Sequence, residues 1–231
     1  QLDFLMETYR LSPSTLNLMI ECKRCFWLQV KKKVYRPRGI MAGIVMRMDS
    51  IIKAYFDKYR AKDQLPPMVD GMIQGLLPKG MPKTLSYQEN DSIIIAGKPD
   101  EYLELPTGEI VPFDHKTKST APDEAHPANL VQIDVYSYLL KMNGYKTTNK
   151  GYLAYYYPEN CELHEGMDMK VKIIEVKTDV ERVKKLLGKV SILLHKEVPP
   201  EPNKICEYCN WAKNAISNIE QLQKVQIKLR K

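Results

Sequence analysis

Two acidic residues and one lysine, Asp100, Asp114 and Lys116, have the spacing of a metal site on a β-hairpin. Asp100 closes the segment GKPD, Asp114 and Lys116 lie in IVPFDHKTK at 110–118, and a Pro-Thr-Gly turn separates the two segments. If that turn is a three-residue loop, Asp100 lies opposite Asp114, and opposed side chains share a face with Cβ atoms about 5 Å apart. Lys116 follows Asp114 by two residues and therefore points to the same face of its strand.

Two carboxylates at that distance repel each other unless one is protonated or a cation lies between them. A divalent ion removes the repulsion, because Mg²⁺ typically binds one or two carboxylates together with substrate phosphate. Lys116 is then placed to orient a water molecule or to stabilise charge on the phosphate. A lone D-x-K motif usually lies on a solvated strand face. Here Val111 and Phe113 predict a half-buried strand, in which an unpaired charge is costly.

Gln132 and Tyr136 are four residues apart in a stretch with helical periodicity, so they are neighbours on one helix face. The pair carries little information alone. Its weight comes from following the D-x-K segment after one loop, which lets the helix return to the same site. Together these residues predict a metal-dependent nuclease site.

The elements that position these residues follow from the spacing of apolar residues. One helix is expected to begin at Ser12-Pro13 and to carry Cys22 and Cys25 at its end. The other predicted helices span 44–60, 128–142, 179–196 and 210–231. Strands are predicted over 85–89, 93–105, 109–117, 151–157 and 169–177.

This order of elements predicts an α/β fold with a mixed central sheet flanked by helices. We expect a single domain over 1–231, with the catalytic core at 85–196. Two cysteine-bearing segments, 11–30 and 203–212, are expected to clamp the ends of the chain together.

Four of the five cysteines form two CxxC pairs, Cys22 with Cys25 and Cys206 with Cys209, whereas Cys161 has no partner in the sequence. The N-terminus lacks the features of a signal peptide, so we expect a cytoplasmic protein with reduced thiols. Paired CxxC motifs then indicate metal or redox chemistry. Four thiolates suit a 4Fe-4S cluster and a tetrahedral Zn²⁺ equally well.

The composition is that of a globular protein, with 44% hydrophobic and 27% charged residues in a chain of 231. No run of 18 apolar residues occurs, so no membrane span is expected. The net charge of +7 permits a nucleic-acid partner without requiring one. The densest basic run is either a solvated turn or a nucleic-acid contact. It contains Lys31, Lys32, Lys33, Arg36 and Arg38.

In order along the chain, G-x-x-D (97–100), D-x-K (114–116) and Q-x-x-x-Y (132–136) resemble the PD-(D/E)XK nuclease superfamily. The branch that they resemble is RecB-like and includes the iron–sulfur exonucleases of CRISPR adaptation and recombinational repair. LSPSTLNLMIECKRCFWL and CEYCNW resemble the cysteine-bearing ends of that branch, so the likeness extends over nearly the whole chain.

The resemblance implies roles for individual residues. Asp100 and Asp114 would bind Mg²⁺ or Mn²⁺ with the backbone carbonyl of His115, and Lys116 would be the catalytic lysine. The helix pair, Gln132 and Tyr136, would shape the active site and the DNA path. The four paired cysteines would hold a 4Fe-4S cluster, with structural Zn²⁺ as the alternative.

Two features depart from the family pattern. The second helix of the family usually supplies a metal-binding His, but residues 43–53 contain none, and Asp49 is the nearest substitute. The alternative for Asp49 is an exposed helical carboxylate. The family pattern of one N-terminal and three C-terminal cysteines is replaced here by two and two.

The implied activity is that of a Mg²⁺- or Mn²⁺-dependent deoxyribonuclease, an exonuclease or an enzyme directed to single strands or ends. It would act in DNA repair, recombination or CRISPR-type defence, with a protein partner in such a complex. The alternative is a catalytically weak protein that keeps the nuclease fold and binds nucleic acid or a partner. A third possibility is a structural module held together by zinc.

Overall fold

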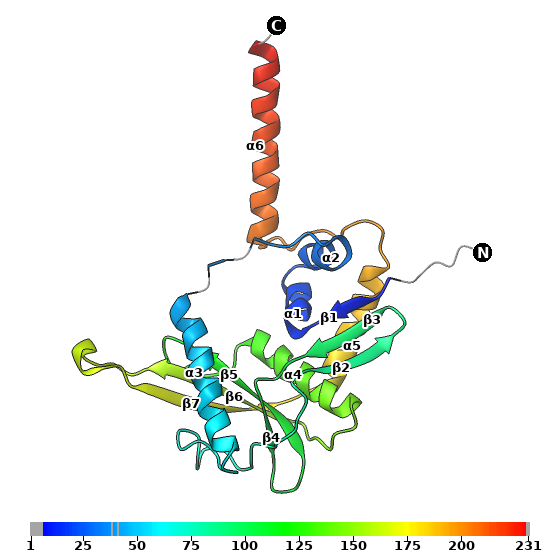
Figure 1. Cartoon of the computed structure of the whole chain (residues 1–231). Helices are drawn as coiled ribbons and strands as arrows, with labels where there is room; N and C mark the ends of the chain where they lie inside the picture. Colours follow the sequence, from blue (N-terminus) through cyan, green and yellow to red (C-terminus); the bar gives the residue numbers. More distant parts are fainter. Residues whose placement is uncertain (1–6, 38, 41, 230–231) are drawn as a thin grey trace. The chain divides into compact units, whose positions relative to one another are not determined.

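The computed structural model describes residues 7–37, 39–40 and 42–229, with side chains described for 7–37, 39–40, 42–162 and 164–221. The chain forms two compact units (Figure 1). Unit 1 contains Gln1–Pro13 and Gly39–Leu187, and unit 2 contains Ser14–Arg38 and Gly188–Lys231. The single domain expected from the sequence stays a prediction. Within the described residues, no helix is both long and apolar enough to cross a membrane.

The larger sheet of unit 1 has four strands in the order β4-β5-β6-β7. Strands β4 (Glu101–Glu104) and β5 (Ile110–Thr117) are antiparallel, β5 and β6 (Lys150–Pro158) are parallel, and β6 and β7 (Met169–Lys177) are antiparallel. This mixed sheet with helices on it confirms the predicted α/β class.

A second sheet of unit 1 has three strands, β1 (Tyr9–Leu11), β3 (Ile93–Gly97) and β2 (Leu85–Asn90), in that order. The single strand expected over 93–105 was wrong, because the chain leaves this sheet at Gly97 and enters the other sheet at Glu101. Pro99 lies in the break and has no N–H to donate to a strand ladder. Strand β1, which pairs in parallel with β3, was not predicted because three residues are too few to show a period.

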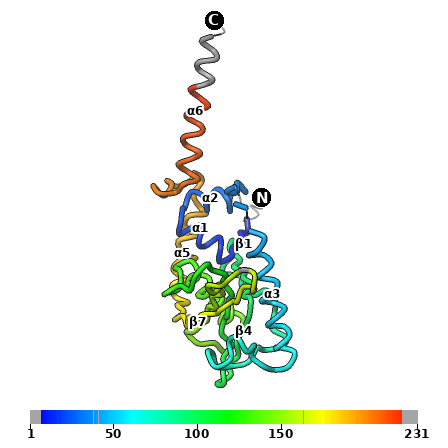
Figure 2. The backbone as a smooth tube through the Cα atoms, turned by 90° about the vertical axis from the view of Figure 1, so that its left-hand side faces the viewer, coloured from blue at the N-terminus to red at the C-terminus, as the bar shows by residue number. Residues whose placement is uncertain are grey.

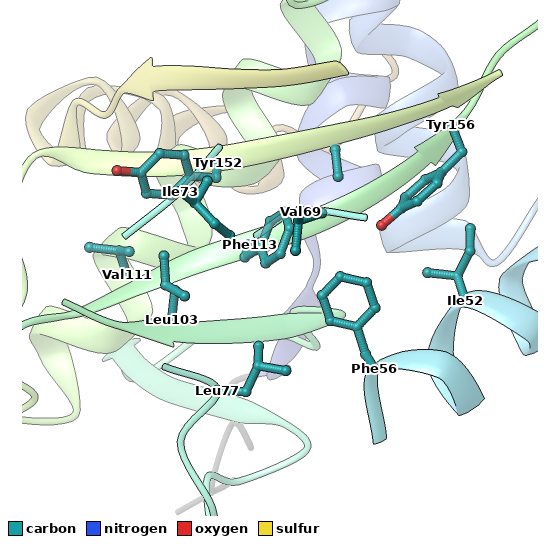
Figure 3. Close-up of a cluster of buried hydrophobic side chains, with 11 residues drawn as sticks. Ile52, Phe56, Val69, Ile73, Leu77, Leu103, Val111, Phe113, Tyr152 and Tyr156 are labelled. Atoms are coloured by element: carbon teal, nitrogen blue, oxygen red, sulfur yellow. The ribbon is translucent and has the colours of Figure 1, made fainter. Parts of the chain in front are cut away.

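Helices α3 (Gly43–Arg60) and α4 (Pro127–Met142) pack on opposite faces of the four-stranded sheet. Phe56 and Ile52 of α3 contact the face that presents Phe113, as Figure 3 shows. Ile133 and Tyr136 of α4, with Leu153 and Tyr155, form a separate cluster on the other face. Successive strand residues point to opposite faces, so each strand serves both clusters.

The remaining secondary structure of the region 159–194 is a 3-10 turn, η1 (Leu163–Glu165), and a helix, α5 (Val180–Leu194). The carboxylate of Asp179 caps α5 by accepting bonds from the backbone N–H groups of Glu181 (3.0 Å) and Arg182 (3.1 Å). The Arg182 guanidinium is paired with the buried Asp134 of α4, which fixes the start of α5 to α4.

The helices of unit 2 differ from the prediction at one point. The helix expected over both N-terminal cysteines is two helices, α1 (Pro13–Glu21) and α2 (Lys23–Lys32), because Cys22 between them is extended (φ −157°, ψ 107°). Cys206 directly precedes α6 (Glu207–Leu229), and Cys209 lies in its first turn. Figure 2 shows α6 as the helix that follows α5 in the chain.

Candidate active site and metal centre

The β4–β5 hairpin has the register that its turn predicts. Glu101 pairs with Phe113, and the pairing continues without a shift to Glu104 and Ile110 beside the turn. Asp100 lies one residue before β4, and its Oδ2 accepts a hydrogen bond of 3.1 Å from the backbone N–H of His115. The Asp100 carboxylate is therefore fixed beside the segment that carries Asp114 and Lys116.

Asp114 is buried, with 1% of its surface exposed. The Lys116 ammonium is paired with its Oδ2, and the amide of Gln132 donates to its Oδ1 at 3.2 Å. Burial raises the pKa of Asp114 to about 7, an effect that the charge of Lys116 opposes and the charge of Asp100 increases. The carboxylates of Asp100 and Asp114 are close enough for their charges to interact, and a further cation would relieve their repulsion.

Helix α4 is tied to the same site by Tyr136. Its hydroxyl accepts a bond of 2.8 Å from Gln132 and donates to the carbonyl of Lys98 at 3.1 Å. Burial raises the pKa of Tyr136, so the phenol stays protonated and keeps donating. A Cβ at Gly97 would lie 2.8 Å from the Tyr136 ring, so Gly97 lets the ring approach the backbone. The structure therefore brings Gln132 and Tyr136 to the two carboxylates.

Lys53 also lies beside the candidate site, which the sequence did not predict. Its Nζ lies 2.7 Å from Asp49 Oδ2 and 3.5 Å from Asp100 Oδ1. Burial lowers the pKa of Lys53, but the hydrogen bond to Asp49 and the charge of Asp100 outweigh this effect and leave the pKa above its usual value. The i,i+4 spacing of Asp49 and Lys53 was the only sequence signal, and it does not point to Asp100. Asp49 reaches the site through this lysine.

The side chain of His115 points away from the carboxylates into the core under α3. Its ring packs 4.4 Å from the Phe56 ring, and its Nδ1 lies 3.3 Å from the hydroxyl of Tyr156. Burial lowers the pKa of His115 to about 4, so the imidazole is neutral near pH 7. Only its backbone is available to the site, where the N–H already binds Asp100.

The donor set fits a hard divalent ion. Asp100 and Asp114 offer carboxylate oxygens, the ligand type that Mg²⁺ and Mn²⁺ prefer. Among the described residues, no third carboxylate or imidazole joins them closely enough to form a three-ligand group. An ion held here would therefore rely on two carboxylates, with backbone carbonyl, water and phosphate oxygens completing its shell.

The four paired cysteines meet within unit 2. Their sulfur atoms all lie within 4.8 Å of one another, and three of the separations are 3.5, 3.6 and 3.8 Å. Burial disfavours the Cys22 thiolate, but hydrogen bonds from the backbone at Cys25 and Asn203 lower the pKa of Cys22 to about 6. Arg36 donates to Cys206 Sγ at 3.6 Å. The two CxxC motifs thus bring four thiols together in a group, the thiol cluster, that could hold a metal ion, and the exposed Cys161 is not part of it.

The basic run predicted to contact nucleic acid is largely engaged within the protein. Lys31 Nζ donates to the carbonyls of Leu194 (3.1 Å) and Lys196 (2.8 Å). Lys33 Nζ donates to a backbone carbonyl at 2.9 Å. Lys32 Nζ lies 5.5 Å from the centre of a tryptophan ring. Arg38 lies outside the described residues.

Arg36 combines two further contacts. It forms an ion pair of 2.7 Å with Glu21, and its guanidinium lies 4.6 Å from the centre of the Tyr208 ring. A nucleic-acid role for the basic run stays a prediction.

Comparison with known proteins gives one family match. The model of the PD-(D/E)XK nuclease superfamily matches residues 33–213. No curated protein matches the chain.

Two solved structures resemble the chain at low identity. The first, described as the crystal structure of SSO0001, is 16% identical over 88% of this chain and 84% of its own, with a TM-score of 0.47. The second, an alkaline exonuclease (LHK-Exo) from Laribacter hongkongensis, is 11% identical over 95% of this chain and 94% of its own, with a TM-score of 0.44.

Proposed function

The chain belongs to the PD-(D/E)XK nuclease superfamily, and from this premise we propose that it is a Mg²⁺- or Mn²⁺-dependent deoxyribonuclease. The observation that carries the proposal is the contact set around Asp114. Its buried carboxylate lies beside Asp100 and is bound by Lys116 and Gln132, which come from the motifs whose spacing suggested the activity.

Each residue of this set has a role in phosphodiester hydrolysis. Asp100 and Asp114 would hold the divalent ion, with the backbone carbonyl of His115 as a further ligand. When bound, such an ion supplies a more acidic water and offsets negative charge on the phosphate. Lys116, which is paired with Asp114 in this structure, would orient the attacking water or stabilise the phosphate oxygen.

The two helix residues act on the geometry of the site. The Gln132 amide donates to Asp114 Oδ1 while Lys116 is paired with Oδ2, so both oxygens of this carboxylate are held in a fixed orientation. Tyr136 holds the backbone at Lys98, two residues before Asp100, and so fixes where β4 begins. Both are proposed as positioning residues that also border the DNA path.

The proposed substrate is DNA, as single strands or ends, within a repair, recombination or defence complex of the RecB-like type. The order of the motifs and the cysteines at both ends of the chain support this finer assignment. We propose that cleavage starts at a DNA end, and comparing the cleavage of circular and linear DNA tests this.

For the thiol cluster we propose a structural role, and its sulfur spacing favours one tetrahedral Zn²⁺ over a 4Fe-4S cluster. Zn–S bonds of about 2.3 Å at tetrahedral angles place sulfurs about 3.8 Å apart, and the four sulfur atoms here lie within 4.8 Å of one another, with three separations of 3.5–3.8 Å. An iron–sulfur cluster inserts its own iron and sulfide atoms between the thiolates and needs a wider cage. Metal analysis and the visible spectrum of the purified protein decide between the two.

The test of the activity is cleavage of supercoiled DNA and of 5′- or 3′-labelled single strands with Mn²⁺, with chelator as the blank. The wild type should cut the labelled linear strands and leave the closed circle intact, because the proposed attack is from an end, and Lys116→Ala should cut neither substrate. Lys118→Ala is the matched control, because Lys118 is an exposed lysine just after the same strand. Cleavage that survives Lys116→Ala would contradict the proposed site.

One observation favours a second candidate, a catalytically weak protein that binds DNA or a partner. The ion would have few protein ligands, and the Lys53 ammonium already lies at Asp100. DNA binding without Mn²⁺-dependent cleavage would select this candidate.

A further inference from the structure

A groove in unit 2 collects exposed aromatic side chains. Among the side chains that the structure describes, the Trp, Tyr and Phe residues that are largely exposed are Tyr35 (62%), Tyr208 (41%) and Trp211 (71%). All three line the same cavity of about 590 Å³, formed by α2, the segment 34–37 and the first turns of α6. Aromatic rings usually bury their large apolar area, so three exposed rings around one hollow indicate a ligand.

The charges around this groove select the kind of ligand. Arg24, Arg36 and Lys213 line it, whereas Glu220 is the single acidic residue among the lining side chains. The Arg36 guanidinium lies against the Tyr208 ring and so adds a flat cation to the aromatic surface. Rings interleaved with cations bind bases by stacking and phosphates by charge.

The charge of the whole unit points the same way. Unit 2 contains 15 Lys and Arg against five Asp and Glu, whereas unit 1 contains 20 against 23. The basic surplus of the protein is therefore confined to the unit that carries the groove. Such a surface attracts a polyanion and repels a second copy of itself.

We propose that this groove binds unpaired nucleotides of single-stranded DNA, with bases stacked on Trp211 and Tyr35 and phosphates facing Arg24 and Lys213. Paired bases in a duplex are already stacked on one another and leave no free face for these rings. The inference rests on the proposed function, since it takes DNA as the substrate. It adds a binding site that contains none of the catalytic residues.

The test measures DNA binding in a protein that does not cut. Full-length Lys116→Ala, purified with the metal it contains, is titrated into a labelled single strand of roughly 12 nucleotides, within the range of single-strand-binding sites. Trp211→Ala in this background should weaken binding about tenfold, and Trp211→Phe should restore most of it. Ile219→Ala is the matched control, because Ile219 is 54% exposed on the same helix and does not line the groove. Tyr35→Ala, on another segment, should weaken binding in the same way.

Two comparisons make the result specific. A blunt duplex should lose little affinity on Trp211→Ala, and an abasic strand of the same length should bind the parent protein as weakly as the intact strand binds Trp211→Ala. Equal losses for duplex and single strand, or no loss at all, would overturn the proposal. So would a change from dimer to monomer on Trp211→Ala with unchanged DNA affinity, since the groove would then be a protein interface. If the wild type neither cuts nor binds any DNA, the proposed function fails as well, whereas cutting with normal binding by Trp211→Ala refutes the groove alone.

Discussion

Replacing Lys53 by Met should strengthen the binding of a divalent ion at the carboxylates. The Lys53 ammonium lies 3.5 Å from Asp100 Oδ1, so a bound ion would sit close to a positive charge. Two unit charges about 4 Å apart interact by roughly 1 kcal/mol in water and about 4 kcal/mol near a protein surface. Because the Lys53 side chain is 40% exposed, the value for water applies, and a doubly charged ion raises it to about 2 kcal/mol.

A repulsion of about 2 kcal/mol corresponds to a dissociation constant for Mn²⁺ that falls roughly 10- to 30-fold in Lys53→Met. Calorimetric titration of the protein with Mn²⁺ measures it without any substrate. Lys58→Met is the matched control, because Lys58 is an exposed lysine of the same helix whose Nζ lies over the Tyr59 ring. Equal or weaker Mn²⁺ binding by Lys53→Met, with Lys58→Met unchanged, would show that Lys53 does not compete with the ion, and that Asp49 and Lys53 instead support its binding.

Three further predictions concern stability and the thiol cluster. Gly97→Ala should lower the free energy of unfolding by roughly 1–3 kcal/mol in urea, because the new Cβ would lie 2.8 Å from the Tyr136 ring. The helical control Gly188→Ala, with nothing within 4 Å of its Cβ, should raise it slightly; equal effects would contradict the packing argument. Since burial lowers the pKa of His115 from 6.5 to about 4, its contribution to stability is complete above pH 6.5 and is lost as the pH falls towards 4. Wild type should therefore lose roughly 3 kcal/mol more than His115→Phe over that interval, and parallel pH curves would refute this. Cys25→Ser should reduce bound zinc from one ion per chain and lower the melting temperature, whereas Cys161→Ser should do neither; a brown protein containing iron would contradict the zinc assignment.

The register of β4 against β5 could be predicted because it depends on one short turn between neighbouring segments of the chain. The Pro-Thr-Gly turn fixes the register of β4 against β5, and this register determines which residues face Asp114. The helix that carries Gln132 and Tyr136 follows after one loop. The short connection leaves few positions for this helix, and Gln132 therefore lies within hydrogen-bond distance of both Asp114 and Tyr136.

The features that were missed depend on contacts between distant segments. Lys53 lies beside Asp100 because the packing of α3 on the sheet fixes where the helix residues lie relative to β4. The sequence around residue 53 does not reveal this packing. The close approach of the Tyr136 ring to Gly97 likewise joins α4 to a strand that is distant in the sequence. Cys22 is extended even though its neighbours favour a helix, because it must bring its sulfur to Cys209.

In the proposed site, the carboxylate of Asp114 binds the ion that makes hydrolysis possible. The most direct measurement is the rate of Mn²⁺-dependent cleavage of a labelled single strand by Asp114→Asn, which keeps the shape and the bond to Gln132 but removes the charge. Asp123→Asn, in the exposed loop before α4, is the control. Asp114→Asn should lose at least about 10³-fold in rate and bind Mn²⁺ weakly, whereas Asp123→Asn should match wild type. Cleavage by Asp114→Asn at the wild-type rate would show that this carboxylate does not bind the ion.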